Sequence, residues 1–181
     1  MTPSAPAPEE DPLGPEWATA ADGTRTRSAA RVVVLDGASR VLLVRGGDPA
    51  VPGSRWWFTP GGGIAAGESP AEAAARELAE ETGIAVAPAA LTGPVLRRAP
   101  VFEWLGRSCR QEELFYLARL PSPPRLSRAG WTALERATLD DVRWWAAGEL
   151  AVTADDVYPP SLAEHVERLG RGWDGRLLQV D

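Results

Sequence analysis

Glutamates on one predicted helix are the residues whose type and spacing best suit chemistry. Projected at about 100° per residue, Glu80 falls about 60° to one side of Glu77 and Glu81 falls about 40° to the other. Carboxylates this close repel one another and raise one another's pKa. A hard divalent cation such as Mg²⁺ or Mn²⁺ would offset the repulsion, because it takes oxygen ligands and bridges carboxylates to substrate phosphates. The spacing therefore indicates a metal site for phosphate chemistry, and the alternative is a solvated acidic face.

The composition of the chain removes most other catalytic designs. The sequence contains one histidine, His165, one cysteine, Cys109, and no lysine. These counts argue against a Ser-His-Asp triad, a multi-histidine or thiolate metal site, a Schiff-base lysine and a Walker-type phosphate loop. The formal net charge of −6 argues against a nucleic-acid polymer as partner, because proteins that coat polyanions carry a basic excess.

The glutamates belong to a longer motif that includes a glycine turn before the helix. The pattern G-x5-E-x7-R-E-U-x-E-E-x-G-U, in which U is a bulky aliphatic residue, is filled at every specified position from Gly62 to Ile84. This pattern is the Nudix box, and the chain resembles the Nudix hydrolases from the predicted hairpin at residues 32–45 to about Ala151. Because so many positions are specified, the match is a strong signal, unlike a lone glycine motif.

The resemblance implies both a fold and a reaction. It implies an α+β protein with a Nudix-type α/β/α sandwich around a mixed β-sheet. It also implies hydrolysis of a small-molecule nucleotide, a nucleoside diphosphate linked to another moiety, such as a nucleoside triphosphate or an ADP-ribose-like compound, with Mg²⁺ or Mn²⁺. The alternative is a nucleotide-binding sensor without turnover, and the complete box favours the enzyme.

By match to the motif, the resemblance also implies roles for individual residues. Three glutamates correspond to catalytic metal ligands: Glu77, Glu80 and Glu81. The carbonyl of Gly61 often adds a ligand in this family. Arg76 and Glu68 match the pair that holds the loop and orients the catalytic glutamates.

Because the single histidine is not usable, the general base is expected to be a carboxylate or a metal-bound hydroxide, and the resemblance implies that a further glutamate from outside the box is often recruited. Residues 110–118 read as a strand, on which Glu113 shares one face with Phe115, while Glu112 lies on the other face. A glutamate in line with apolar core residues needs a reason to be there, and a metal or an activated water supplies one. We therefore favour Glu113 over Glu112 as the base or accessory ligand.

Substrate contacts are predicted at three further residues. Trp56, just ahead of the glycine turn, could stack on a base, although an aromatic residue there could equally belong to the core. Arg97 and Arg98 could contact phosphates, because arginine binds them in bidentate fashion, and the alternative is that both are surface arginines.

The elements that position these residues are predicted from hydrophobic patterns. Pro70–Thr82 is the clearest helix, with Ser69 as N-cap, Glu72 completing a capping box and Gly83 ending it. A second helix is predicted over residues 161–171. Strands are predicted at residues 31–36 and 40–45 as a hairpin, and at 56–59, 95–104, 110–120 and 141–145.

The length of 181 residues suits one domain and a tail. Residues 1–25 begin with a proline-rich stretch and are predicted to be a disordered tail, and residues 26–181 a single domain with a C-terminal helix. Neither a signal peptide nor a membrane span is recognised, so a cytoplasmic location without a membrane partner is expected. A homodimer is left open.

Overall fold

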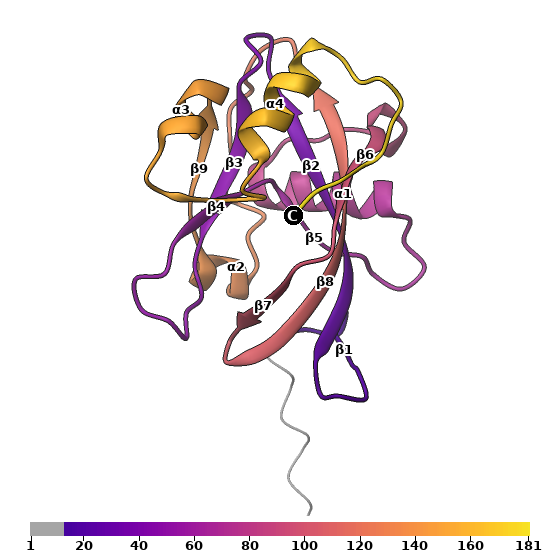
Figure 1. Ribbon diagram of the computed structural model, residues 1–181, viewed down its shortest axis with the longest axis vertical. Coiled ribbons are helices and arrows are strands. Elements are labelled where there is room, and N and C mark those ends of the chain that lie inside the picture. The colour runs from indigo at the N-terminus through magenta and orange to yellow at the C-terminus, as the bar shows by residue number, and fades with distance from the viewer. Residues whose placement is uncertain (1–12) are drawn as a thin grey trace, which may run out of the picture.

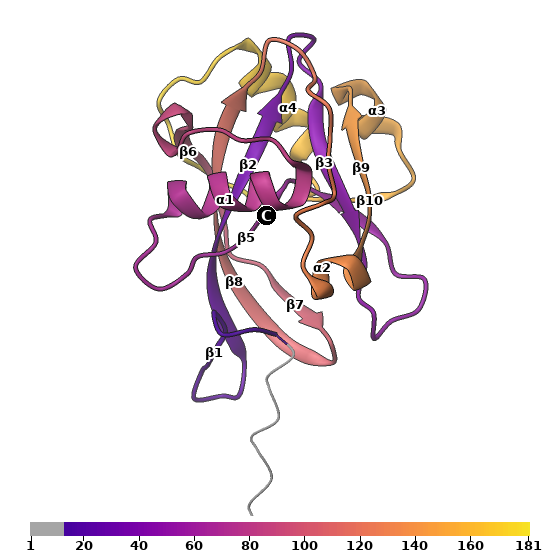
Figure 2. The ribbon, with the colours of Figure 1, turned by 180° about the vertical axis from the view of Figure 1, so that it is seen from behind.

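The computed structural model describes residues 13–181, and it forms a mixed sheet covered by helices on both faces (Figures 1 and 2). The helices are α1 (Pro70–Thr82), α2 (Ala133–Thr138), α3 (Ala147–Val152) and α4 (Leu162–Arg171), with a 3₁₀ turn at Pro88–Ala90. The strands are β1 (Ala18–Thr19), β2 (Arg25–Leu35), β3 (Val41–Gly46), β4 (Trp56–Phe58), β5 (Gly61–Gly63), β6 (Thr92–Arg98), β7 (Val101–Trp104), β8 (Arg107–Arg119), β9 (Leu139–Trp145), β10 (Asp156–Tyr158) and β11 (Leu178–Gln179).

The sheet is organised around the two long strands β2 and β8. These strands pair in parallel, with Arg25 opposite Cys109 at one end and Leu35 opposite Arg119 at the other. The main path through the sheet is β10-β4-β3-β2-β8-β6-β11, and β1 and β5 pair with β2, β7 with β8, and β9 with β3. Because β2–β3 and β6–β8 are antiparallel, the sheet is mixed, as predicted.

Two apolar layers hold the helices on the sheet. Alternation along β2 sends Val32 and Val34 toward α1 and Val33 toward α3 and α4. Leu78 of α1 is fully buried in the first layer, and Leu162 of α4 is fully buried in the second. The resulting helix–sheet–helix arrangement confirms the predicted α/β/α sandwich (Figure 2).

Helix α1 begins and ends where its capping residues predict. The Ser69 hydroxyl accepts a hydrogen bond from the backbone N–H of Glu72, and the Glu72 carboxylate accepts one from the N–H of Ser69. Gly83 ends the helix in the left-handed conformation, with φ of 77°. These caps fix the register of the helix, and therefore the direction in which its glutamates point.

The N-terminal boundary differs from the prediction. Residues 13–25 were expected in the disordered tail, but Leu13 and Trp17 are buried and pack with Cys109, and β1 pairs with β2. Burial of these two large apolar side chains anchors the stretch on the domain despite the prolines nearby. The prediction of disorder for residues 1–12 lies outside the described residues.

Several short elements were not predicted. Helices α2 and α3 span six residues each, too few for a helical hydrophobic period to be recognised. The irregular strand predicted over residues 95–104 is two strands, β6 and β7, separated by Ala99 and Pro100. No helix in residues 13–181 is both long enough and apolar enough to span a bilayer.

Candidate active site

A cavity of about 880 Å³ lies between α1, α2, the strands β2 and β8, and the β7–β8 hairpin. Figure 2 shows α1 in front of the sheet, with α2 beside its C-terminal end and the hairpin below. The cavity brings together most of the predicted site residues: Trp56, Gly61, Arg76, Glu77, Glu80, Glu81, Arg98 and Glu113. Arg97 is exposed and is not among the lining residues, so its predicted substrate contact is not supported.

Strand β5 is pressed between β2 and α1, and this contact places two glutamates. A Cβ atom on Gly62 would lie 2.6 Å from the carboxyl group of Glu77, so a larger residue would displace that carboxyl group from its position. The backbone N–H of Gly61 donates a 2.9 Å hydrogen bond to Glu81 Oε2. Glu81 is only 4% exposed, and Glu77 is partly buried. The glycine turn therefore fixes the orientation of both carboxylates.

Arg76 connects the carboxylates of the box. Its Nη1 donates to Glu77 Oε1 at 2.8 Å and to Glu80 Oε2 at 3.0 Å, and its Nε donates to Glu68 Oε1 at 2.8 Å. Its Nη2 donates to the carbonyl of Gly63, on the glycine turn. Hydrogen bonds to Glu68, and then to Glu77, raise the pKa of Arg76. This geometry supports the predicted role of Arg76 and Glu68 in orienting the glutamates.

A third glutamate near Glu77 and Glu81 comes from α2 and was missed by the sequence analysis. One carboxylate oxygen each of Glu77, Glu81 and Glu135 lies within 4.8 Å of the other two. Glu135 also caps its own helix, since its Oε2 accepts a 2.6 Å hydrogen bond from the N–H of Thr132. The indole Nε1 of Trp131 donates to the Glu81 carbonyl at 2.8 Å, which ties the start of α2 to α1.

The electrostatics of this cluster favour a cation. Burial raises the pKa of Glu81 well above its usual range, and the nearby charge of Glu77 raises it further. Burial also raises the pKa of Glu77, despite its hydrogen bond from Arg76. Three convergent carboxylates form the all-oxygen donor set that Mg²⁺ and Mn²⁺ prefer. The residues therefore fit a divalent ion, with Glu80 held at the edge of the cluster by Arg76.

We expect the repulsion between these carboxylates to lower the stability of the ion-free protein once they are ionised. Because the folded state raises the pKa of Glu81 above 4.5, folded protein binds that proton more tightly than unfolded chain does. Stability is therefore lost as pH rises above about 4.5, and Glu81→Gln should remove the part of this loss that Glu81 contributes, while its amide oxygen can still accept from Gly61. Melting temperatures in EDTA should coincide for the two proteins below about pH 4.5 and diverge above it in favour of the variant. Parallel curves throughout would contradict the raised pKa.

Glu113 faces the cavity as predicted, and Glu112 is exposed on the other face. Glu113 is 3% exposed, and its Oε1 accepts from Arg31 Nε at 2.5 Å, while Arg98 Nη1 lies 3.5 Å from its Oε2. Burial would raise the pKa of Glu113, but the charge and hydrogen bond of Arg31, the charge of Arg98 and a hydrogen bond from Gln111 hold it below its usual value. Its role as base stays a prediction, and the geometry shows it as the counter-ion of two arginines.

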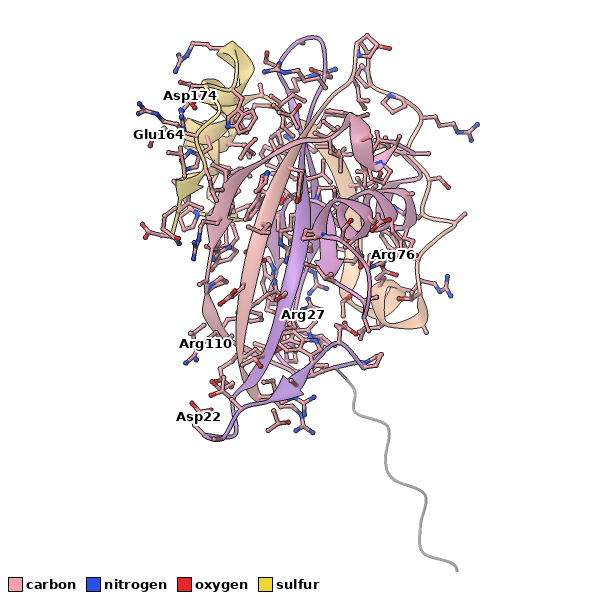
Figure 3. All side chains as sticks on the ribbon, turned by 90° about the vertical axis from the view of Figure 1, so that its right-hand side faces the viewer. Asp22, Arg27, Arg76, Arg110, Glu164 and Asp174 are labelled. Carbon is pink, nitrogen blue, oxygen red and sulfur yellow. The ribbon has the colours of Figure 1, made fainter. Side chains whose placement is uncertain are left out.

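Two arginines of β2 also line the cavity and were not predicted as site residues. Arg31 donates from Nη1 to the carbonyls of Thr59 and Gly61, at 3.1 Å and 3.2 Å. The Gly61 carbonyl, a predicted metal ligand, therefore already accepts from a guanidinium. Arg27 Nη1 forms an ion pair with Glu16 Oε1 at 2.9 Å. Figure 3 labels Arg27 on β2 and Arg76 on α1. The even spacing of Arg27 and Arg31, which puts both on one face of β2, was the available sequence signal.

Comparison with known proteins gives a family match over most of the chain. A family model described as NUDIX domain matches residues 25–168. An RNA pyrophosphohydrolase of Dinoroseobacter shibae is 47% identical over 60 residues, which are 33% of this chain and 36% of that protein. The chain thus aligns with about a third of that relative's length.

Solved structures show the same fold at low sequence identity. An Ap4A hydrolase of C. elegans, in a binary complex, has a TM-score of 0.57 at 21% identity, covering 81% of this chain and 99% of that one. A MutT NUDIX hydrolase of Burkholderia pseudomallei has a TM-score of 0.55 at 19% identity, covering 80% and 98%.

Proposed function

Since this chain belongs to the Nudix hydrolase family, we propose that it is a Mg²⁺- or Mn²⁺-dependent pyrophosphohydrolase of a small nucleotide, a nucleoside diphosphate linked to another moiety. The observation that carries the proposal is the cluster of Glu77, Glu81 and Glu135 beside a cavity of about 880 Å³. A cavity of this size suits a nucleotide, since small-molecule sites span about 300–1,000 Å³. The complete box and the convergent glutamates favour turnover over sensing.

Glu77, Glu81 and Glu135 would hold the divalent ion, and Arg76 would keep Glu77 and Glu80 in position. When bound, the ion would neutralise charge on the diphosphate and lower the pKa of a water for attack at phosphorus. A carboxylate of the site would take up the proton that the water loses as the water oxygen bonds to phosphorus, and the P–O bond to the leaving group would break. Arg76 is fully engaged with its carboxylate partners, so its contribution is orientation.

Arg98 is the arginine we propose to bind substrate phosphate. Its Nε is buried without a hydrogen-bond partner in the described part of the chain, and its nearest ion-pair contact is 3.5 Å long. Arg31, by contrast, makes close contacts with Glu113 and with two backbone carbonyls. The arginine with unused donor capacity is therefore the one best placed to bind an incoming anion.

The substrate is best identified by a direct screen. Nucleoside triphosphates, nucleoside diphosphate sugars, dinucleoside polyphosphates and 5′-triphosphorylated RNA would be incubated with Mg²⁺ or Mn²⁺, and phosphate release scored after a coupling phosphatase. We expect turnover of a small nucleotide rather than of the RNA, because the chain has a net charge of −6 and no basic excess. Turnover of none of them with either ion would contradict the proposed function.

The ion pairs of Glu113 lead to a prediction that distinguishes two roles for this residue, holding Arg98 in place and acting as the general base. If Glu113 holds Arg98 for substrate binding, Glu113→Gln should raise KM about tenfold or more and lower kcat less, because ground-state contacts are disturbed. Steady-state kinetics on the substrate from the screen would measure both constants. A fall in kcat at unchanged KM would instead assign the base to Glu113.

A further inference from the structure

Aromatic side chains from β4 and the β7–β8 hairpin also line the cavity. Trp56, at the start of β4, and Trp104, at the end of β7, place their ring centroids 6.1 Å apart at an interplanar angle of 72°. Phe58 and Phe102 line the same cavity, and all four rings remain partly accessible. The two indoles therefore form an apolar corner within the site, built from segments far apart in the sequence.

One cation that lines the cavity, Arg27, is already neutralised. Arg27 donates from Nε to Gln111 Oε1 and from Nη1 to Glu16 Oε1, and its guanidinium lies 4.4 Å from the centroid of the Trp17 ring. Glu103 adds an exposed carboxylate beside Trp104. A phosphate would therefore meet occupied or negative groups here, whereas an uncharged flat group would meet indole faces.

The corner depends on residues outside the segment that matches the family. Leu13 and Trp17, 2% and 7% exposed, pack with buried Cys109, and Phe102 and Trp104 of the β7–β8 hairpin pack against this cluster. The family match begins at residue 25, so this support lies outside the matched segment. Leu13 and Trp17 are positioning residues, since they hold the hairpin that carries Trp104.

We propose that Trp56 and Trp104 form the subsite for the nucleobase of the substrate, and that residues 13–17 hold this subsite in shape. The assignment of the occupant rests on the proposed function, because it takes the substrate to be a nucleotide. A base would lie flat on one indole with its edge toward the other, an arrangement that suits the π-systems of both partners. Stacking of this kind depends little on base identity, because every base has a π-face.

The test measures the contribution of the base to binding, without turnover. Calorimetry in Mg²⁺ would compare the four nucleoside 5′-monophosphates with ribose 5-phosphate, which lacks only the base. We expect the wild-type protein to bind at least one nucleotide about tenfold more tightly than ribose 5-phosphate, the effect of one stacked base. Trp104→Ala should bring this ratio close to one, and Trp104→Phe should retain most of it.

Three further variants complete the design. Trp173 is a partly buried tryptophan that does not line the cavity, so Trp173→Ala should leave the ratio unchanged. Trp17→Ala should lower the ratio as Trp104→Ala does, with rescue by Trp17→Phe, while the Tm gain on adding Mg²⁺ persists because the glutamate cluster is intact. Circular dichroism would confirm that every variant is folded.

The outcomes separate the subsite from the reaction. Equal affinity for all five ligands in the wild-type protein, no measurable binding of any, or a ratio that survives Trp104→Ala would overturn the subsite. The protein could instead bind a nucleotide more tightly than ribose 5-phosphate, lose that preference in Trp104→Ala, and hydrolyse nothing in the screen. This outcome would support the subsite and refute the proposed reaction.

Discussion

Excess EDTA is expected to abolish nucleotide hydrolysis, and added Mg²⁺ or Mn²⁺ is expected to restore it. The reason is the cluster of Glu77, Glu81 and Glu135, whose oxygens converge within 4.8 Å and whose mutual repulsion a bound cation relieves. The ion is also expected to raise the Tm, because a ligand that binds the folded state stabilises it by mass action. Phosphate release and thermal melts on the same EDTA-treated sample would measure both effects.

Ca²⁺ provides a control for this experiment. Ca²⁺ accepts oxygen ligands but forms longer bonds and a more flexible coordination shell than Mg²⁺. We expect it to raise the Tm of the EDTA-treated protein and to support little turnover. Full hydrolysis in excess EDTA would contradict the metal-dependent mechanism, whatever the Tm does.

Glu81→Gln is expected to lower kcat by at least about 100-fold, because a lost metal contact costs a few kcal/mol of barrier and each 1.36 kcal/mol is about a factor of ten. Glu135→Gln should lower kcat by at least about tenfold, since its carboxylate comes from another element but enters the same cluster. Titrations of Mg²⁺ against activity should show a weaker apparent affinity for both variants.

A matched substitution tests whether these losses are specific. Glu164 is an exposed glutamate on α4, far from Arg27 of the cavity in Figure 3, and Glu164→Gln should leave kcat and the Mg²⁺ titration unchanged. Near-normal turnover in Glu81→Gln would refute the ligand assignment. Near-normal turnover in Glu135→Gln alone would remove only α2 from the metal site.

The residues that sequence reasoning placed well are those governed by local rules. The caps Ser69, Glu72 and Gly83 set the ends of α1, and helical periodicity then placed Glu77 and Glu81 on one side of it. Strand alternation likewise separated Glu113, which faces the cavity, from Glu112, which does not. In each case the information needed lies within a few residues of the side chain concerned.

The residues that sequence reasoning missed are positioned by contacts with residues far away in the sequence. Glu135 reaches the cluster only because Trp131 docks α2 on the carbonyl of Glu81, a contact across 50 positions. Arg97 and Arg98 look equivalent as neighbours in the sequence, and only the position of β6 in the sheet turns one inward and the other outward. The ordered residues 13–17 were missed because their partners lie on the β7–β8 hairpin.

Cys109 packs beneath Leu13 and Trp17, so the reactivity of its thiol is a measure of local opening at this place in the structure. Cys109 is fully buried, and burial raises the pKa of its thiol, so the folded protein should react slowly with thiol reagents. Because it is the single cysteine of the chain, the rate of labelling measures how often the N-terminal stretch lifts from the hairpin. A bound nucleotide that tightens the indole corner would lengthen the labelling half-life, and Trp17→Ala would shorten it.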